Sequence, residues 1–217
     1  MNNTIKNYIF DLDGTLINSC NEVLECFKKA FNVTGYPLDE SRLTDNLIGP
    51  PLREIILNIA PELDDEKILN EITLNFRNIY DNDTNDSSVL YDGIFEFLTK
   101  LKESGKKVFL ATLKPTKPTQ RILRDFLPDI FDDVYTIDKF QKHITKKEMI
   151  LDIIKKYNLN KSETLMLGDA ASDAISANEA GITSVGALWG YGDNKEDLIE
   201  NSKYVISRIE ELGCLKI

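Results

Sequence analysis

Two aspartates, separated by one residue, follow the apolar segment 8–10 near the start of the chain. Alternate side chains of an extended chain point to the same side, so Asp11 and Asp13 face one way. Gly14 then permits a sharp turn, and we expect the hydroxyl and amide of Thr15 to be free to meet an anion. Because neighbouring carboxylates repel each other unless a cation or proton lies between them, the pair indicates a divalent metal with a phosphate opposite.

An ordinary acidic turn is the alternative interpretation, since Asp and Gly are common turn residues. A second pair of aspartates argues against it. Asp169 follows the apolar segment 164–167 and Gly168, and Asp173 lies one helical turn further on. Ligands of open α/β sheets bind at the carboxyl ends of the strands, so we expect Asp169 on the same rim as the first pair. Helix capping is the alternative for this second pair.

A hydroxyl group ends a third apolar segment, where residues 108–111 lead to Thr112. Such a hydroxyl can donate to a phosphate oxygen, although β-branched residues are common in strands for other reasons. Leu113 offers no polar group from its side chain. For Lys114 we consider a contact to the substrate, with a simple exposed lysine as the preferred alternative.

These segments resemble the motifs of the haloacid dehalogenase (HAD) phosphatase superfamily over the whole chain. Segment 10–16 (Phe-Asp-Leu-Asp-Gly-Thr-Leu) is similar to motif I, and segment 168–173 (Gly-Asp-Ala-Ala-Ser-Asp) is similar to motif IV. Thr112 looks like the Ser/Thr of motif II, and Lys146 looks like the lysine of motif III. Lys147 leaves that assignment open by one position, and the spacing to the apolar helix face favours Lys146. Relatives usually carry a polar residue where this chain has Leu113.

The resemblance implies phosphoryl transfer. Asp11 would attack phosphorus and form an aspartyl-phosphate intermediate, and Asp13 would act as general acid and then as general base. Lys146, Thr112 and backbone amides near residues 12–14 would stabilise the charge on the phosphoryl oxygens. Dehalogenating relatives lack the second aspartate, so Asp13 favours phosphate chemistry.

The resemblance also implies a magnesium site. The Asp11 carboxylate, the Asp13 backbone carbonyl and Asp169 would hold Mg²⁺, with Asp173 supporting it. Such a set suits Mg²⁺, which prefers oxygen ligands and commonly uses few carboxylates together with substrate phosphate.

Substrate choice is expected to depend on the segment 48–53 (Ile-Gly-Pro-Pro-Leu-Arg), which is similar to a loop of phosphoglycolate-phosphatase-like and 5′-nucleotidase-like members. Gly49 and Arg53 are the candidate substrate contacts here, together with Gly14 and Thr15. The substrate is then a small organic phosphate: phosphoglycolate, a nucleoside monophosphate or a sugar phosphate. A sugar phosphomutase is the nearest alternative, but its Lys-Gly-x-x-Arg pattern lacks the lysine here and its arginine is displaced by one position. A non-catalytic phosphate-binding protein on the same fold remains the third possibility.

The elements that must position these residues form an alternating series. Apolar strand segments alternate with amphipathic helices from about residue 93 to residue 207, which predicts a doubly wound parallel α/β sheet. The predicted helices span 93–104, 118–126, 146–157, 170–180 and 195–201, and the predicted strands span 107–112, 134–136, 163–168, 182–186 and 203–207. Between the first strand and this series the pattern is helical, with helices behind Asn18 and Ser19, from Pro51, and over 64–80. We expect a core domain of residues 1–17 and 89–217 and an inserted helical cap of residues 18–88, with a linker at 81–88.

Composition excludes several other classes of protein. A net charge of −10 and a pI near 4.7 argue against a binder of nucleic-acid polymers. The three cysteines are odd in number and lack metal-ligand spacing, which predicts reduced thiols, and the single His143 is expected on the surface. No apolar segment approaches the length of a membrane span. We therefore expect a cytoplasmic enzyme, monomeric or homodimeric, that acts on a small phosphorylated metabolite and contacts no membrane.

Overall fold

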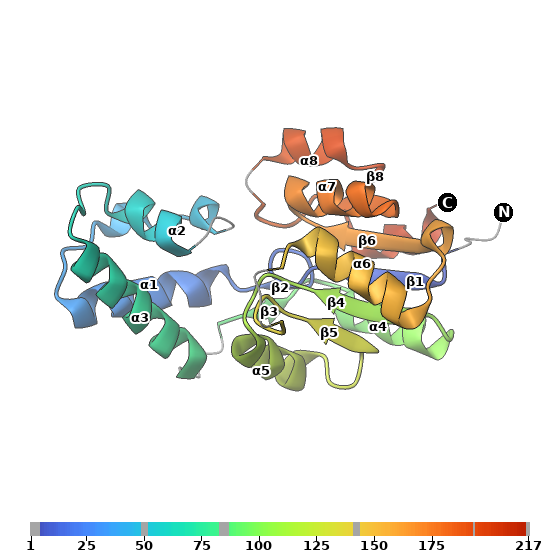
Figure 1. The fold of residues 1–217 in the computed structure, drawn as a ribbon, viewed down its shortest axis with the longest axis horizontal. Helices are drawn as coiled ribbons and strands as arrows, with labels where there is room; N and C mark the ends of the chain where they lie inside the picture. Colours follow the sequence, from blue (N-terminus) through green and yellow to red (C-terminus); the bar gives the residue numbers. More distant parts are fainter. Residues whose placement is uncertain (1–4, 49–51, 83–86, 141–143, 193, 216–217) are drawn as a thin grey trace. The chain divides into compact units, whose positions relative to one another are not determined.

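The chain forms two compact units in a computed structural model, which describes residues 5–48, 52–82, 87–140, 144–192 and 194–215 (Figure 1). The first unit contains residues 1–18 and 90–217, and the second contains residues 19–89. Gly49, Pro51 and His143, which entered the predictions above, lie outside the described residues.

A parallel sheet lies at the centre of the first unit. Its order in the described part of the chain is β5-β4-β1-β6-β7-β8, and every neighbouring pair is parallel. The strands are β1 (Asn7–Phe10), β4 (Lys107–Ala111), β5 (Asp133–Tyr135), β6 (Thr164–Gly168), β7 (Thr183–Ala187) and β8 (Tyr204–Ile206). Parallel strands need crossover connections, and helices supply them here. The helices of this unit are α4 (Ile94–Glu103), α5 (Thr116–Phe126), α6 (Lys146–Tyr157), α7 (Ala171–Ala180) and α8 (Lys195–Asn201), and the 3₁₀ helices are η3 (Lys161–Glu163) and η4 (Ile209–Cys214).

Each face of this sheet has its own apolar core. Tyr8 and Phe10 of β1 pack with residues of α4, α5 and η4, whereas Ile9 packs with residues of α6 and α7. Alternate residues of one strand therefore serve opposite faces, and a strand buried on both faces is uniformly apolar. β1 and its neighbours β4 and β6 lie in the middle of the sheet with both faces covered, which accounts for their apolar sequences. Their carboxyl ends lie side by side.

The predicted fold class, a doubly wound parallel α/β sheet, is confirmed. The helix over 146–157 and the helix over 195–201 have the predicted ends, and the other helices and strands of this series shift by one or two residues. A two-stranded sheet of β2 (Ile17–Asn18) with β3 (Val89–Leu90) was not predicted, because strands of two residues carry no period. Asp81, expected in a linker, belongs to α3 instead.

The second unit is helical. It contains α1 (Cys20–Thr34), α2 (Leu52–Ile59) and α3 (Glu66–Asn82), and the 3₁₀ helices η1 (Glu40–Arg42) and η2 (Asp45–Leu47). Phe27 of α1 packs on Phe76 of α3 with ring centroids 4.3 Å apart, and the Asn75 amide donates to the Thr34 hydroxyl. Aromatic contacts of this kind add to the apolar area that two amphipathic helices bury.

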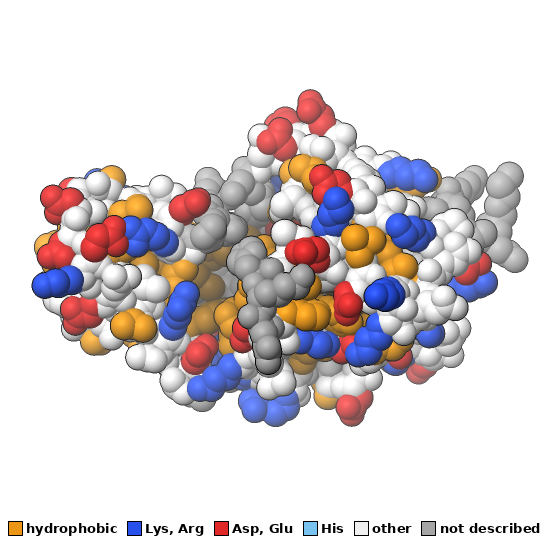
Figure 2. Space-filling model, in the orientation of Figure 1, with side chains coloured by type: hydrophobic (Ala, Val, Ile, Leu, Met, Phe, Trp, Pro, Cys, Tyr) orange, Lys and Arg blue, Asp and Glu red, His pale blue; other side chains and the backbone are white. Residues whose placement is uncertain are grey.

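Charged side chains of both signs alternate on the visible surface of each unit, so the net charge of −10 is not gathered into one patch on that face (Figure 2). Among the described residues, none of the helices combines the length and the apolar character that a membrane span requires.

Candidate active site

Three buried carboxylates meet at the carboxyl edge of the sheet. Asp11 directly follows β1, and Asp169 directly follows the neighbouring β6, while Asp173 lies in the first turn of α7. The Asp11 amide donates to the Leu167 carbonyl, which extends the pairing of the two strands to the site itself. Oxygens of the three carboxylates lie within 4.8 Å of one another. We call Asp11, Asp169 and Asp173 the acidic cluster.

Two glycines allow the backbones to approach these carboxylates. Gly14 has a φ of +76°, and a Cβ at this residue would lie 2.0 Å from an Asp169 carboxylate oxygen. A Cβ at Gly168 would lie 2.2 Å from an Asp173 carboxylate oxygen. Any other residue at position 14 would meet both backbone strain and a direct overlap, so this turn requires glycine.

Asp169 is held by groups from two other segments. The Thr15 hydroxyl donates to one of its oxygens at 3.1 Å, and the Gly192 amide donates to the other at 2.9 Å. The prediction that Thr15 is free to meet an anion is therefore wrong: its hydroxyl holds Asp169, and its amide donates to the Leu12 carbonyl within the turn. The Gly14 amide is also used within the turn, where it donates to the Ile17 carbonyl, so it is not an available phosphate ligand either.

Lys146 supplies the positive charge that contacts the acidic cluster. It is the first residue of α6, whose start is fixed by a capping box between Thr145 and Glu148. Its ammonium lies 3.0 Å from an Asp11 oxygen and 2.5 Å from an Asp173 oxygen. Lys147 points elsewhere and pairs with Glu179 at 3.1 Å. Of the two lysines considered for this role, the structure brings Lys146 to the cluster.

The acidic cluster carries more negative charge than its contacts neutralise. Burial raises the pKa of Asp11 to about 8, against the opposing effect of Lys146, and the charges of Asp173 and Asp169 add to the rise. Burial and the nearby Asp173 raise the pKa of Asp169 to about 6. Burial alone would lower the pKa of Lys146, but the carboxylates of Asp11 and Asp173 outweigh it and raise that pKa. Among the described residues, three carboxylates meet one contacting ammonium, that of Lys146, which leaves a formal excess of two negative charges when all are ionised. Lys195 acts on Asp169 only through its more distant charge.

This donor set fits a divalent cation. Carboxylate oxygens from three positions converge, they are buried, and their formal excess of two charges equals the charge of one such ion. Hard cations such as Mg²⁺ take oxygen ligands of this kind, and a bound ion would lower the pKa of the carboxylates that burial raises.

Asp13 stands beside the acidic cluster with a partner of its own. The Lys114 ammonium lies 2.9 Å and 3.2 Å from the two Asp13 carboxylate oxygens. The preferred sequence-based interpretation of Lys114 as an exposed lysine is wrong, because only 4% of its side chain is exposed. The reason is tertiary: β1 and β4 are paired neighbours, so the residues just after both strands meet at one rim.

Thr112 follows β4 on the same rim. It is buried, its amide donates to the Tyr135 carbonyl, and its hydroxyl accepts a hydrogen bond from the Lys114 amide. The hydroxyl proton of Thr112 can still be donated to another group. Leu113, between two buried residues, is half-exposed.

Sequence reasoning missed the loop that follows β7. A Cβ at Gly190 would lie 2.2 Å from the Gly14 carbonyl oxygen, and the Gly192 amide donates to Asp169. The Trp189 indole donates to the Thr15 carbonyl, and the Lys195 ammonium donates to the Gly190 carbonyl. The signal was present as Trp-Gly-Tyr-Gly just after a predicted strand, at the edge where the acids were already expected.

Of the predicted contacts in the second unit, only Arg53 is described. It lies in α2 and forms an ion pair with Glu66 at the start of α3, and both side chains are exposed. Gly49 lies outside the described residues.

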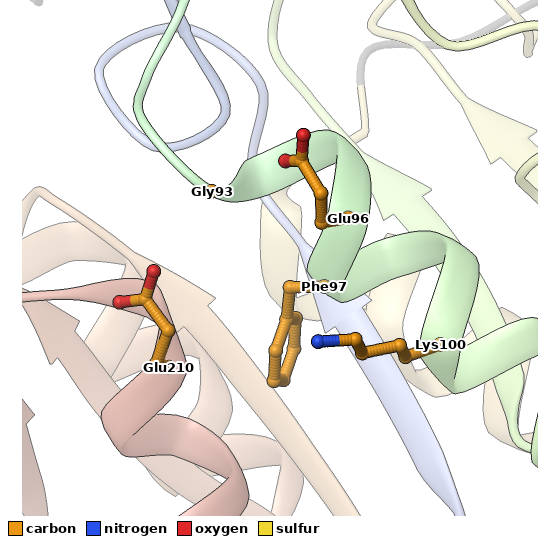
Figure 3. A pocket seen from close by; sticks show the side chains of 5 residues that line it. All are labelled: Gly93, Glu96, Phe97, Lys100 and Glu210. Atoms are coloured by element: carbon orange, nitrogen blue, oxygen red, sulfur yellow. The ribbon is translucent and has the colours of Figure 1, made fainter.

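A hollow elsewhere on the first unit holds none of these residues. Its volume is about 490 Å³, and Gly93, Glu96, Phe97, Lys100 and Glu210 line it. Figure 3 shows Glu96, Phe97 and Lys100 along α4, with Glu210 on the facing η4. It is open and bears charges of both signs, so the acidic cluster remains the better candidate for catalysis.

Comparison with known proteins decides the family. The profile of the haloacid dehalogenase-like hydrolases matches residues 8–187, which include the three carboxylates, Lys146 and Lys114. The chain belongs to the haloacid dehalogenase-like hydrolase family. The resemblance stated from the motifs is confirmed.

Individual HAD relatives are similar over nearly the full chain. Phosphoglycolate phosphatase of Vibrio vulnificus (strain CMCP6) is 30% identical over 217 residues, which cover 96% of this chain and 94% of the relative. Pyrophosphatase PpaX of Halalkalibacterium halodurans is 28% identical and covers 96% of this chain and 95% of its own. A crystal structure from Clostridium difficile, described as that of a candidate phosphatase, superposes with a TM-score of 0.87 at 28% identity, with full coverage of both chains. These HAD relatives confirm the prediction of an enzyme of the phosphatase type.

Proposed function

We propose that this HAD enzyme is a Mg²⁺-dependent phosphatase that hydrolyses a small organic phosphate monoester. The observation that carries the proposal is the acidic cluster: three convergent buried carboxylates, one lysine, and an excess of two negative charges. The names of its relatives, phosphoglycolate phosphatase and pyrophosphatase, support phosphate as the group acted on.

Mg²⁺ would be held by Asp11, Asp169 and Asp173, with the Asp13 backbone carbonyl as a further ligand. When bound, the ion would neutralise charge on the phosphoryl oxygens and on the carboxylates around it. The fixed positions of these ligands are set by the chain itself, since Thr15 and Gly192 orient Asp169 and the Ala170 amide donates to Asp173.

Asp11 is the proposed nucleophile. Its carboxylate oxygen attacks phosphorus while the ester P–O bond breaks, which leaves an aspartyl phosphate and an alkoxide. Lys146, 3.0 Å from Asp11, is close enough to orient that carboxylate and to meet the negative charge of the transferred group. Thr112 can donate its hydroxyl proton to a phosphoryl oxygen.

Asp13 is the proposed general acid and base. It gives its proton to the leaving alkoxide in the first half of the reaction, and it takes a proton from the attacking water in the second. The water attacks phosphorus, the Asp11–phosphate bond breaks, and inorganic phosphate leaves with Asp11 restored.

The second unit is proposed to act as a cap that selects the leaving group, with Arg53 as the candidate contact for a second negative charge. A cap between motif I and the next core strand can close over a small metabolite and exclude water during transfer, whereas it leaves little room for a phosphoprotein.

A substrate panel tests this function. The purified protein is assayed for phosphate release from phosphoglycolate, nucleoside monophosphates, sugar phosphates, pyrophosphate and p-nitrophenyl phosphate, with Mg²⁺ or with EDTA. We expect release from at least one monoester with Mg²⁺ and none with EDTA. A protein that releases no phosphate from any of them, or that isomerises a sugar phosphate without net hydrolysis, contradicts the proposal.

A further inference from the structure

The ammonium group of Lys114 is buried against the carboxylate of Asp13. It contacts both carboxylate oxygens, at 2.9 Å and 3.2 Å, while 4% of the lysine side chain and 24% of the aspartate side chain are exposed. Desolvating an ammonium is unfavourable unless a partner of opposite charge compensates for it. A lysine in this position therefore has a defined partner, and that partner is the proposed acid/base rather than a carboxylate of the acidic cluster.

The backbone of Lys114 is fixed from both sides. Its amide donates to the Thr112 hydroxyl at 3.1 Å, and the next residue is Pro115, which precedes α5. A residue before proline is restricted to extended conformations, so Lys114 cannot join the following helix. Thr112 and Lys114 are buried, whereas Leu113, in the bend between them, is half-exposed. The lysine backbone is thus held just after β4, and its side chain reaches Asp13 just after β1.

The two lysines of the site contact different carboxylates. Lys146 contacts Asp11 and Asp173, the proposed nucleophile and a carboxylate of the acidic cluster. Lys114 contacts Asp13 from the neighbouring strand, on the other side of β1 from β6. A single point charge can hold a carboxylate in one orientation when it bridges both oxygens, and proton transfer requires an orientation held within a fraction of an ångström.

We propose that Lys114 is a positioning residue for Asp13: its ammonium holds the Asp13 carboxylate in the orientation that exchanges a proton with the leaving oxygen and with the attacking water. The proposal rests on the proposed phosphatase function. Lys114 itself stays protonated throughout and neither gives a proton to the substrate nor bonds to phosphorus. The proton travels only between Asp13, the leaving oxygen and water.

Leaving-group dependence tests the proposal. A p-nitrophenolate ion leaves without protonation, whereas the alkoxide of glycerol 2-phosphate needs a proton, so the first half-reaction depends on Asp13 only for the alkyl ester. The second half-reaction depends on Asp13 for both esters. The variants are Lys114→Met, which removes the charge at similar length, and Lys114→Arg, which retains it.

Rapid-mixing kinetics with Mg²⁺ give the readout. For Lys114→Met with p-nitrophenyl phosphate, we expect a burst of p-nitrophenolate at a rate within about twofold of the unmodified protein, followed by turnover slowed about tenfold to a hundredfold, since misplaced acid/base groups cost rates of this order. Labelled phosphate should accumulate on the protein. With glycerol 2-phosphate, formation of the phosphoenzyme should itself slow by a similar factor. Lys114→Arg should recover part of the turnover.

The control is Lys102→Met, which breaks another lysine–aspartate pair of the first unit, the 3.1 Å contact with Asp132. It should show neither burst nor accumulated phosphoenzyme beyond that of the unmodified protein. A Lys114→Met protein whose burst rate falls equally for both esters, with KM raised for both, would show a phosphate ligand instead and overturn the proposal. Unchanged turnover with only a lower melting temperature would overturn it as well. If the unmodified protein releases phosphate from no ester of the substrate panel, the phosphatase function itself fails, which is a separate result.

Discussion

Two groups of acids and lysines in the first unit, one buried and one partly exposed, have opposite electrostatic balance. In the acidic cluster, three carboxylates share the contact of one ammonium, and the pKa values of Asp11 and Asp169 are raised. At the start of β5, by contrast, the single carboxylate of Asp133 accepts hydrogen bonds from Lys139 at 2.7 Å and from Lys156 at 2.8 Å. We call Asp133, Lys139 and Lys156 the Asp133 cluster.

The Asp133 cluster is complete without a further ion. Burial alone would raise the pKa of Asp133, but the two lysines and the Val134 amide outweigh it and lower that pKa to about 2. Tyr157 adds another donor at 3.1 Å. In the Asp133 cluster, the lysines neutralise the carboxylate and the contacts stabilise the fold. In the acidic cluster, the single lysine leaves negative charge that a bound cation can neutralise. This difference separates a structural from a catalytic use of the same residue types.

The largest expected effect concerns the nucleophile in the acidic cluster. Asp11→Asn should lower kcat by about a thousandfold or more, because an amide cannot attack phosphorus and single members of a catalytic set carry effects of that size. Since burial and the neighbouring carboxylates disfavour the charged form of Asp11, the metal-free variant with a neutral amide should melt at a temperature equal to or above that of the unmodified protein. Calorimetry and steady-state kinetics check both parts. Near-normal kcat in a folded Asp11→Asn protein would refute covalent catalysis by this residue.

The second expected effect concerns the ligand set. Asp169→Ala should raise the Mg²⁺ concentration for half-maximal activity by about tenfold to a hundredfold, the usual cost of damaging a metal site. Ca²⁺ should not replace Mg²⁺, since its larger and looser coordination shell misaligns the nucleophile. Activity is titrated against each metal after EDTA treatment. An unchanged Mg²⁺ dependence in Asp169→Ala would place the metal elsewhere.

The Asp133 cluster should affect stability alone. Asp133→Asn should lower the free energy of unfolding by about 1–3 kcal/mol at neutral pH, since charge-assisted hydrogen bonds are lost and two lysines lose their partner. Because the folded pKa of Asp133 is lowered to about 2, its contribution is present above the unfolded value near 4 and is lost as the pH falls toward 2. Urea unfolding at several pH values measures the difference in free energy of unfolding between the unmodified protein and Asp133→Asn. This gap should close as the pH falls from about 4 to about 2. A change in kcat, or a gap that persists below that range, would contradict the assignment.

The smallest effect is expected in the second unit. Arg53→Ala should raise KM several-fold for a doubly anionic ester such as phosphoglycolate and leave p-nitrophenyl phosphate nearly unchanged, because one exposed ion contact contributes about 1 kcal/mol or less. Glu66→Gln is the matched control: it removes the partner of Arg53 and keeps the guanidinium, so KM for the dianion should not rise. Equal responses of the two esters to Arg53→Ala would remove this residue from substrate selection.

Local signals made most of the core elements predictable. The helix over 146–157 begins at a capping box, Thr145 with Glu148, and its apolar residues recur with the helical period, so its ends follow from neighbouring residues alone. The acids at 11 and 169 were placed on one rim because each follows an apolar strand, and carboxyl ends of parallel strands share an edge.

Partners distant in sequence account for what was missed. Lys114 is buried because its ammonium pairs with Asp13, which follows the neighbouring strand. The two residues are 101 positions apart in the sequence, so no local pattern distinguishes Lys114 from a solvated lysine. The same holds for Thr15, whose hydroxyl meets Asp169, and for Gly190, whose role depends on the close approach of Gly14. Burial and pairing of this kind are set by strand order, which the sequence pattern alone left open.

Calorimetric titration of Mg²⁺ tests the central claim most directly. The claim is that the excess negative charge of the acidic cluster binds one divalent cation. We predict one Mg²⁺ bound per chain in the metal-free protein, about tenfold or more weaker binding in Asp169→Asn, and unchanged binding in Asp133→Asn. Binding that is absent from the unmodified protein, or that Asp133→Asn weakens as much as Asp169→Asn does, would contradict the account.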